Sequence, residues 1–316
     1  MTILFSHPDC MTHDTGWGHP ESIHRLSAIL RRLDAPDFAA LRREEAPLAC
    51  EESLHRVHSP RYVEALREAA PASGYVALDP DTIMSPGSWK AALRAAGAVT
   101  AAIDRVMAGE TRNAFCAVRP PGHHACPGHA MGFCLINNIA VGALHARAMH
   151  DLRRIAVVDF DVHHGNGTQD VFEQDGDLFF ASTHQSGAYP GTGYHDEHGV
   201  AGNILNLPLP PGSGSLPWRQ AMSSHLLPAL DRFAPELVLI SAGFDAHRAD
   251  PLANMMLTED DYFWGTEEIC KIAGRHCQGR VVATLEGGYD LDALASSVAA
   301  HLRALMADVA GTESIS

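Results

Sequence analysis

The sequence lacks an excess of positive charge and any long apolar run. Its 316 residues include 23 Lys and Arg against 38 Asp and Glu, a formal net charge of −15 at pH 7. Binding to nucleic acid phosphates or anionic lipid needs a basic surface, so we expect neither partner. No stretch approaches the ~18 apolar residues of a membrane helix. The N-terminal MTILFSHPDC has no charged segment and no long apolar core, so we expect a cytoplasmic protein without a signal peptide.

Motifs that define several other classes of protein are also missing. The chain has no G-x-S-x-G, no H-E-x-x-H, and no G-x-G-x-x-G between a predicted strand and a helix. These absences weigh against an α/β-hydrolase, a zinc protease of the H-E-x-x-H type and a dinucleotide-binding protein. The seven Cys form no C-x-x-C pair, and several have apolar neighbours. This predicts reduced, buried thiols and no cysteine zinc site.

Histidine, in contrast, is abundant. The chain has 20 His, nearly as many as its 23 Lys and Arg together. Histidine titrates near neutral pH and is the commonest metal ligand in proteins. The composition therefore points to acid–base or metal chemistry, provided that some of the histidines are grouped.

The apolar pattern predicts alternating strands and helices. Apolar residues make up 46% of the chain and charged residues 19%, which rules out disorder as the dominant state. The apolar runs lack alternation, as is typical of parallel strands covered on both faces. The predicted strands are Thr2–Phe5, Phe115–Val118, Ile155–Phe160, Leu178–Ser182, Leu237–Ser241 and Val281–Leu285. The predicted helices cover residues 21–34, 60–70, 87–108, 136–150, 217–233, 259–277 and 291–309.

This alternation predicts the fold class α/β, as a single-domain, doubly wound three-layer sandwich with a mostly parallel central sheet. No linker, composition break or repeat divides the chain. We therefore expect one catalytic domain over residues 1–310 and a frayed C-terminal tail over residues 311–316.

Polar residues follow four of the predicted strands. Their sequences are RPPGHH (residues 119–124), DFDVHHGN (159–166), AGFDAH (242–247) and EGGYD (286–290). In a doubly wound sheet, ligands bind in the crevice beyond the carboxyl ends of the strands. We expect these four loops to form one site.

The segment Asp159-x-Asp161-x-His163 suggests a metal centre. If the strand persists through it, the period of two places the three side chains on one side, within reach of one ion. Carboxylate oxygen and imidazole nitrogen suit Zn²⁺, and Asp245 could complete a set with one open position. Alternatively, the Asp side chains accept hydrogen bonds from loop amides. We favour the metal, because such a group is costly unless a cation neutralises it.

The pair His123-His124 and Tyr289 could supply the rest of an active site. Two neighbouring imidazoles can divide proton acceptance and donation, and a phenol in a Gly-rich loop can donate to an oxyanion. The alternatives are that the histidines are solvated or are further metal ligands, and that Tyr289 only packs against the C-terminal helix.

Six motifs carry a resemblance to one known family: RPPGHHA, GFCLINN, VVDFDVHHGNGT, YPGTG, SAGFDAHRADPL and LEGGYD. In content and order they resemble those of zinc-dependent histone deacetylases. The likeness is to the class II and bacterial histone deacetylase-like amidohydrolase branch of the arginase–deacetylase superfamily. HPESIHRL and LDPDTIMSPGS also resemble loops of this family, so the resemblance spans about residues 4–305. It implies an arginase/deacetylase-like fold.

The resemblance implies one Zn²⁺ per chain, bound by Asp161, His163 and Asp245. It also implies a structural K⁺ held by backbone carbonyls. The residues that match the family's potassium sites are Asp159, Asp161, His163 and Ser182, with Phe172, Asp175 and Leu178 nearby.

The catalytic residues that the resemblance implies are His123, His124, Tyr289, Asp159 and Asn166. Asp159 then orients His123, and the neutral Asn166 partners His124, where class I enzymes have an Asp. Which His is the base and which the acid stays open, and we favour His124 as the principal acid–base group.

The resemblance also implies a substrate tunnel. Phe133 and Tyr189 match its aromatic walls, with Gly132 at its base. Asp79, or alternatively Asp81, resembles the rim aspartate that binds the substrate's backbone amides. Leu252 occupies the position at which polyamine-specific members carry Glu.

The implied activity is hydrolysis of acetyl or other acyl groups from the ε-amine of lysine side chains, with a metal-activated water attacking the amide carbonyl. The alternative substrate is an acetylpolyamine or another small N-acyl amide, which the Leu252 position disfavours. Two further alternatives are a metal-binding regulatory or scaffold protein with a catalytically inactive site, and an arginase-like hydrolase with two manganese ions. The expected partners are an acetylated lysine peptide or protein, or a small N-acetyl amine, and by analogy a second copy of the chain in a dimer or tetramer.

Overall fold

The computed structural model describes residues 1–313. Its core is an eight-stranded sheet of order β2-β1-β5-β10-β9-β6-β7-β8, in which every neighbouring pair is parallel. The strands are β1 (Thr2–Ser6), β2 (Arg42–Glu45), β5 (Asn113–Cys116), β6 (Ile155–Asp159), β7 (Leu178–Gln185), β8 (Ile204–Leu209), β9 (Leu237–Ala242) and β10 (Val281–Leu285). The predicted parallel sheet is confirmed.

Two strands of this sheet, β2 and β8, were not predicted, and they lie at its two edges. Strand β2 has the sequence RREE, and its residues alternate between half-buried and exposed. Strand β8 contains Pro208, which lacks the N–H group that a second neighbour would need. Edge strands need not be apolar on both faces, so neither matches the continuous apolar pattern of the central strands.

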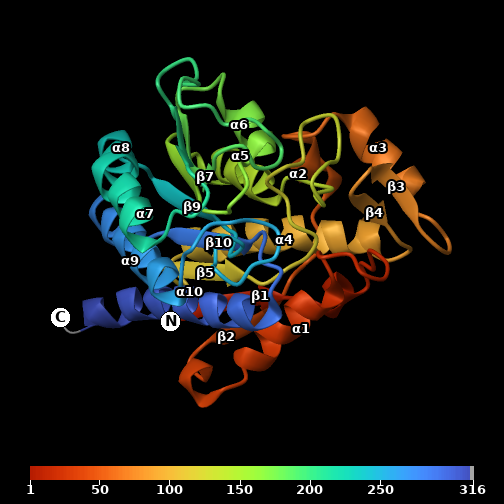
Figure 1. The fold of residues 1–316 in the computed structure, drawn as a ribbon, viewed down its shortest axis with the longest axis horizontal. Coiled ribbons are helices and arrows are strands. Elements are labelled where there is room, and N and C mark those ends of the chain that lie inside the picture. Colours follow the sequence, from red (N-terminus) through yellow and green to blue (C-terminus); the bar gives the residue numbers. More distant parts are fainter. Residues whose placement is uncertain (314–316) are drawn as a thin grey trace.

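Helices cover both faces of the sheet (Figure 1). Helices α4 and α5 pack together on one face, and α1, α9 and α10 lie on the other. The helices are α1 (Ile23–Arg32), α2 (Glu51–His55), α3 (Pro60–Ala69), α4 (Ser88–Met107), α5 (Asn138–His150), α6 (Asn166–Phe172), α7 (Ser215–Ala221), α8 (Leu227–Phe233), α9 (Glu259–His276) and α10 (Leu291–Glu313). Short 3₁₀ helices cover Pro8–Met11 and Pro36–Phe38. No helix in residues 1–313 is long and apolar enough to span a membrane.

Three details of the predicted helices are wrong. The helix expected over 217–233 is interrupted by a π-helical turn at Met222–Leu226, between α7 and α8. The short helices α2 and α6 were not predicted, because five and seven residues are too few for a clear helical period. Helix α10 ends at Glu313, four residues later than predicted. Residues 314–316 of the expected frayed tail lie outside the described residues, and the frayed tail stays a prediction.

A separate antiparallel hairpin, β3 (Val76–Asp79) and β4 (Thr82–Met84), lies beside α3, at the side of the molecule opposite α8 (Figure 1). It carries the two candidate rim aspartates. In the main sheet, β5, β10, β9 and β6 are consecutive neighbours. Parallel strands end at the same edge of a sheet, so the four polar loops that follow these strands meet there.

Candidate active site

Asp161, His163 and Asp245 converge beyond β6 and β9. Their potential ligand atoms all lie within 4.8 Å of one another, and all three side chains are buried. Nδ1 of His163 lies 3.1 Å from Oδ1 of Asp161 and 3.0 Å from Oδ2 of Asp245. Burial opposes a charge on His163, but the two carboxylates raise its pKa well above the ordinary value. Burial and the Asp161 carboxylate raise the pKa of Asp245. The trio therefore attracts a cation.

Two glycines make this convergence possible. A Cβ on Gly243 would lie 2.0 Å from Oδ2 of Asp161, and one on Gly287 would lie 2.1 Å from Oδ2 of Asp245. The carboxylates also accept backbone hydrogen bonds, Asp161 Oδ2 from Gly287 at 2.8 Å and Asp245 Oδ1 from Val162 at 2.9 Å. Bonding to loop amides and metal binding are thus compatible, and this cradle and its donor atoms fit a divalent metal such as Zn²⁺.

The expectation that an extended strand carries Asp159, Asp161 and His163 on one side is wrong. Strand β6 ends at Asp159, and the chain bends there. The bend is held by Oδ1 of Asp159, which accepts from the Asp161 amide at 3.0 Å. Asp159 consequently turns its Oδ2 toward His123 and away from the metal trio.

The two adjacent histidines have different partners. Nδ1 of His123 lies 2.8 Å from Oδ2 of Asp159, and Nδ1 of His124 lies 2.8 Å from Oδ1 of Asn166. The rings of His123 and His124 are 4.0 Å apart between centroids. Helix α6 begins at Asn166, just after the loop that carries Asp161 and His163, and this places the side-chain amide of Asn166 beside His124. Each imidazole is thus oriented through its Nδ1, which leaves Nε2 for chemistry.

The surroundings of the two histidines give them different charge states. Burial alone would lower the pKa of His123, but Asp159, Asp161 and Glu286 raise it to about 10. Burial, reinforced by His123 and His163, holds the pKa of His124 well below its ordinary value. At neutral pH His123 is therefore an imidazolium, whereas His124 is neutral and can accept a proton.

A cavity of about 220 Å³ leads to this centre. Phe133 and Tyr189 line it, and Gly132, with φ +56°, is so close to His124 that a Cβ would lie 2.5 Å from Cδ2 of that ring. Phe133 itself has φ 67°, a strained conformation for a bulky residue. The structure therefore brings the predicted wall and base residues into one cavity lining with His123, His124 and His163.

Tyr289 lies in the same cavity lining. Its ring meets Phe133 edge-on at 5.9 Å between centroids and has the Arg25 guanidinium 4.9 Å away. Desolvation, followed by the charge of Asp245, raises the pKa of Tyr289 well above 10, so the phenol keeps its proton. Asp250 fixes this loop, because its Oδ2 accepts from the Tyr289 amide at 2.7 Å.

At the mouth of the cavity the lining residues are Asp81 and Leu252. Asp79, the first choice for the rim aspartate, is not among the lining residues; it belongs to β3, where its Oδ1 accepts from the Asp81 amide at 3.4 Å. Sequence spacing could not distinguish the two, since the β3–β4 turn decides which one faces the cavity. Of the two, the geometry favours Asp81.

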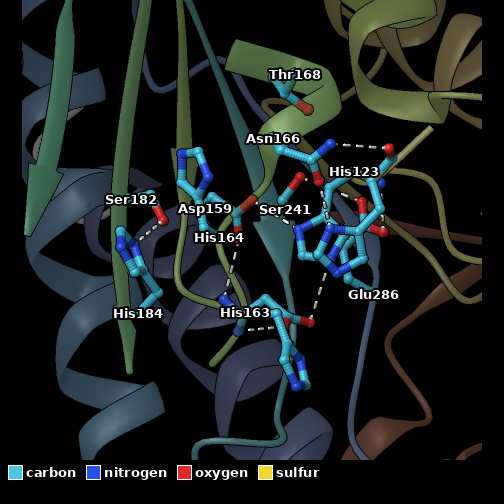
Figure 2. A network of polar contacts seen from close by, with 12 residues as sticks. His123, Asp159, His163, His164, Asn166, Thr168, Ser182, His184, Ser241 and Glu286 are labelled. Atoms are coloured by element: carbon cyan, nitrogen blue, oxygen red, sulfur yellow. Dashed lines mark hydrogen bonds and ion pairs between the residues drawn. The ribbon is translucent and has the colours of Figure 1, made fainter. Parts of the chain in front are cut away.

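Three of the residues proposed for potassium, Phe172, Asp175 and Leu178, lie between the end of α6 and the start of β7. The carbonyls of Phe172, Asp175 and Leu178 converge on Nδ2 of Asn203, at 2.9, 3.1 and 2.8 Å. An amide group thus occupies the point that these carbonyls share. Ser182 instead contacts Nδ1 of His184 through its Oγ, at 2.9 Å (Figure 2). A bound K⁺ stays a prediction.

A second group of potential metal ligands lies on the surface between α4 and α5. Nε2 of His145 and Nε2 of His150 lie 2.8 and 2.7 Å from the same oxygen, Oδ1 of Asp104. Nδ1 of His145 is buried without a partner in the described structure. A metal on Nε2 would force the proton onto this unpartnered Nδ1, which is unfavourable. We therefore assign this group to hydrogen bonding.

Sequence reasoning missed the residues that hold the site together, among them Arg25, Asp250 and Glu286. Arg25 is fully buried, and its Nε donates to the Gly288 carbonyl at 2.6 Å. These three residues lie within HPESIHRL, SAGFDAHRADPL and LEGGYD, but no spacing rule links a side chain to a backbone group far along the chain.

The parallel sheet carries, at its carboxyl edge, a candidate metal centre beside two histidines and a tyrosine, as in hydrolases of the α/β class. The histone deacetylase domain family matches residues 19–305, and the chain belongs to this family.

Relatives and a solved structure agree with this assignment. The chain is 42% identical over 310 residues to "Histone deacetylase 14, chloroplastic" of Arabidopsis thaliana, covering 92% of this chain and 73% of the relative. It is 42% identical over 278 residues to a "Histone deacetylase-like amidohydrolase" of Pseudomonas aeruginosa, covering 86% and 73% of the two chains. The solved HDA15 HD domain superposes with a TM-score of 0.91 at 35% identity, covering 97% of this chain and 88% of the other.

Proposed function

We propose that this protein is a zinc-dependent deacylase that hydrolyses acetyl or other acyl amides of the lysine ε-amine. The observation that carries the proposal is the cavity with aromatic walls, Phe133 and Tyr189, which ends at His124, His163 and Tyr289. Such a passage suits an unbranched alkyl chain that delivers a terminal amide to the metal trio.

The proposed chemistry divides among the chain's own residues. A Zn²⁺ held by Asp161, His163 and Asp245 would supply a Lewis acid for the acyl carbonyl and for the attacking water. His124, neutral and oriented by Asn166, accepts the proton of the water through Nε2.

Tyr289 and the two histidines carry the rest of the reaction. Tyr289 donates its phenolic proton in a hydrogen bond to the developing oxyanion. The protonated His124 then donates to the leaving amine, while His123, protonated at neutral pH, stabilises the negative intermediate. The products are acetate and a free amine.

An acetylpolyamine or other small N-acyl amine is the second candidate substrate. Asp81 at the mouth and the net charge of −15 favour a cationic substrate. The 41% exposed Leu252 at the same mouth offers no charge to hold a distant ammonium group. We therefore place the lysine side chain first.

Steady-state rates on acetyl-lysine peptides and on N-acetylputrescine test this choice, each with and without a hydroxamate chelator. We expect hydroxamate-sensitive turnover, with kcat/KM at least tenfold higher for the peptides. A preference for N-acetylputrescine would reverse the order of substrates, and inertness on both would contradict the proposal. Leu252→Glu should shift the ratio toward N-acetylputrescine, with Leu216→Glu, at an exposed position outside the cavity lining, as the surface control.

The compartment and assembly are part of the same proposal. We propose a cytoplasmic enzyme, although two relatives are named as chloroplastic. We further propose a dimer or tetramer, by analogy with the family, which light scattering of the purified protein would test.

A further inference from the structure

Glu286 is a buried acid that the proposed reaction does not use. Its side chain has no solvent exposure and follows β10, three residues before Tyr289. Oε2 accepts from the backbone amides of Gly122 at 2.6 Å and His123 at 3.1 Å. Oε1 accepts from Oγ of Ser241 at 3.2 Å. Figure 2 shows Glu286 directly beneath His123, with Ser241 close by.

Burying the Glu286 carboxylate lowers the stability of the fold, because the charged form loses its hydration. Burial raises the pKa of Glu286 to about 7, and its hydrogen bonds in the described structure come from two amides and a hydroxyl rather than from a Lys or Arg side chain. A buried acid without a cationic partner destabilises the fold unless its oxygens accept hydrogen bonds from donors that would otherwise lack a partner.

The donors that Glu286 satisfies belong to the loop that carries His123 and His124. Gly122 lies so close to the start of α5 that a Cβ on it would be 2.5 Å from the Asn138 amide. The loop therefore passes between α5 and Glu286, and the carboxylate satisfies two amide donors that would otherwise be buried without partners. One of those amides belongs to His123 itself.

The backbone of Glu286 leads directly to the other reacting groups. The next residue, Gly287, donates its amide to Oδ2 of Asp161 at 2.8 Å, and Tyr289 follows two residues later. The Glu286 carbonyl accepts from Nη2 of Arg25 at 2.5 Å, which anchors the segment from the opposite side. Through these hydrogen bonds, Glu286 links the loop that carries His123 and His124 to the loop that carries Tyr289.

We propose that Glu286 is a positioning residue that sets the His123–His124 pair relative to Tyr289 and the metal trio, acting through its hydrogen-bond acceptor oxygens. The inference rests on the proposed amide hydrolysis, because it concerns the geometry of that reaction. It assigns Glu286 no contact with substrate. A displacement of about 1 Å between such groups can cost about 10²-fold in rate.

Two substitutions separate the acceptor from the charge. Glu286→Gln keeps an oxygen that can accept from both amides but carries no charge, whereas Glu286→Ala removes both. We expect kcat on an acetyl-lysine peptide to fall about 10²-fold in Glu286→Ala and to stay within about tenfold of the parent in Glu286→Gln, because the conservative variant keeps the acceptor. KM and the Zn²⁺ content should change by less than about threefold in both, since Glu286 touches neither substrate nor metal ligands.

Thr284→Val is the matched control. Thr284 lies two residues earlier, near the end of β10, and its buried hydroxyl has no partner in the described structure. The substitution is nearly isosteric, and we expect parental kcat. Equal losses in Glu286→Gln and Glu286→Ala, or parental kcat in Glu286→Ala, would overturn the inference.

Amide proton chemical shifts provide a readout that does not depend on activity. A short hydrogen bond to a carboxylate shifts an amide proton downfield, so the Gly122 and His123 amides should move upfield in Glu286→Ala and much less in Glu286→Gln. Unchanged shifts in Glu286→Ala would also overturn the inference. A parent enzyme that is inert on every amide tested, with shifts that move as expected, would instead contradict the proposed function alone.

Discussion

Oδ1 of Asn166 accepts a hydrogen bond from Nδ1 of His124 at 2.8 Å. An amide oxygen can only accept, so Nδ1 carries the proton and the lone pair of Nε2 faces the cavity. A neutral partner orients the ring without stabilising a positive charge on it. His124 is therefore built as a proton acceptor, in contrast to His123 with its Asp159 carboxylate.

Replacing this amide by a carboxylate should change the pH dependence of the reaction. Asn166→Asp places a negative charge beside His124, which favours the imidazolium and raises its pKa. The base is active only when it is neutral, so the acidic limb of kcat/KM should move to higher pH by about 1 unit or more. Asn166→Ala, which adds no charge, should not produce this upward shift. A limb that stays in place in Asn166→Asp would contradict the assignment.

His124→Ala should lower kcat by about 10²–10⁴-fold, because its neighbour His123 is protonated and cannot accept a proton in its place. The Zn²⁺ content should be unchanged, since Asp161, His163 and Asp245 are intact. His225→Ala, which changes an exposed histidine outside the cavity lining, is the control. Near-parental turnover of His124→Ala would rule out its role as the base.

Tyr289→Phe tests the proposed oxyanion donor. The substitution keeps the ring against Phe133 and Arg25 but removes the hydroxyl. We expect kcat to fall about 10²–10³-fold with little change in KM, because the hydrogen bond strengthens only as negative charge develops on the carbonyl oxygen. A loss confined to KM would instead indicate a role in ground-state binding.

The two groups of potential metal ligands should behave differently. Asp245→Asn should abolish both activity and tight Zn²⁺ binding, because it removes a charged ligand from the buried trio. Asp104→Asn, in the surface group with His145 and His150, should leave one Zn²⁺ per chain. Metal analysis after dialysis measures both, and a stoichiometry that falls in Asp104→Asn would disprove the hydrogen-bonding assignment.

Buried histidines should make the fold sensitive to acid. Burial lowers the pKa of His58 to about 4 and that of His301 to about 3, and burial together with His164 lowers that of His184 to about 3. The unfolded chain protonates these groups below about pH 6.5, whereas the folded protein does not. Their stabilising contribution is complete above that pH and is lost as the pH falls toward 4 and then 3.

Each such histidine should add about 1.4 kcal/mol per pH unit to the slope of the unfolding free energy within this window. His301→Phe should therefore reduce the slope between pH 6 and 4 by roughly one proton. His301 is surrounded by the rings of Phe115, Phe160 and Phe244, which suit an aromatic substitute. Urea unfolding at several pH values measures the slope, and an unchanged slope would show that His301 is protonated in the folded state.

Most of the central sheet could be predicted from local pattern, because strands such as β6 and β9 are apolar at nearly every position and carry their own signal. The edge strands β2 and β8 could not, because their pairing depends on a neighbour rather than on their own composition. The rim posed the same difficulty, since Asp79 and Asp81 differ only in which one the β3–β4 turn presents to the cavity.

The sequence by itself determined which chemical groups this protein has and that they follow the ends of four strands, because motif and strand are local properties of the chain. Only the tertiary structure decided which group does what. The bend after Asp159 separates the carboxylate facing His123 from those of the metal trio. Likewise, Glu286 meets the His123 amide across 163 positions of sequence. Such contacts depend on how distant segments pack, and no local pattern records that.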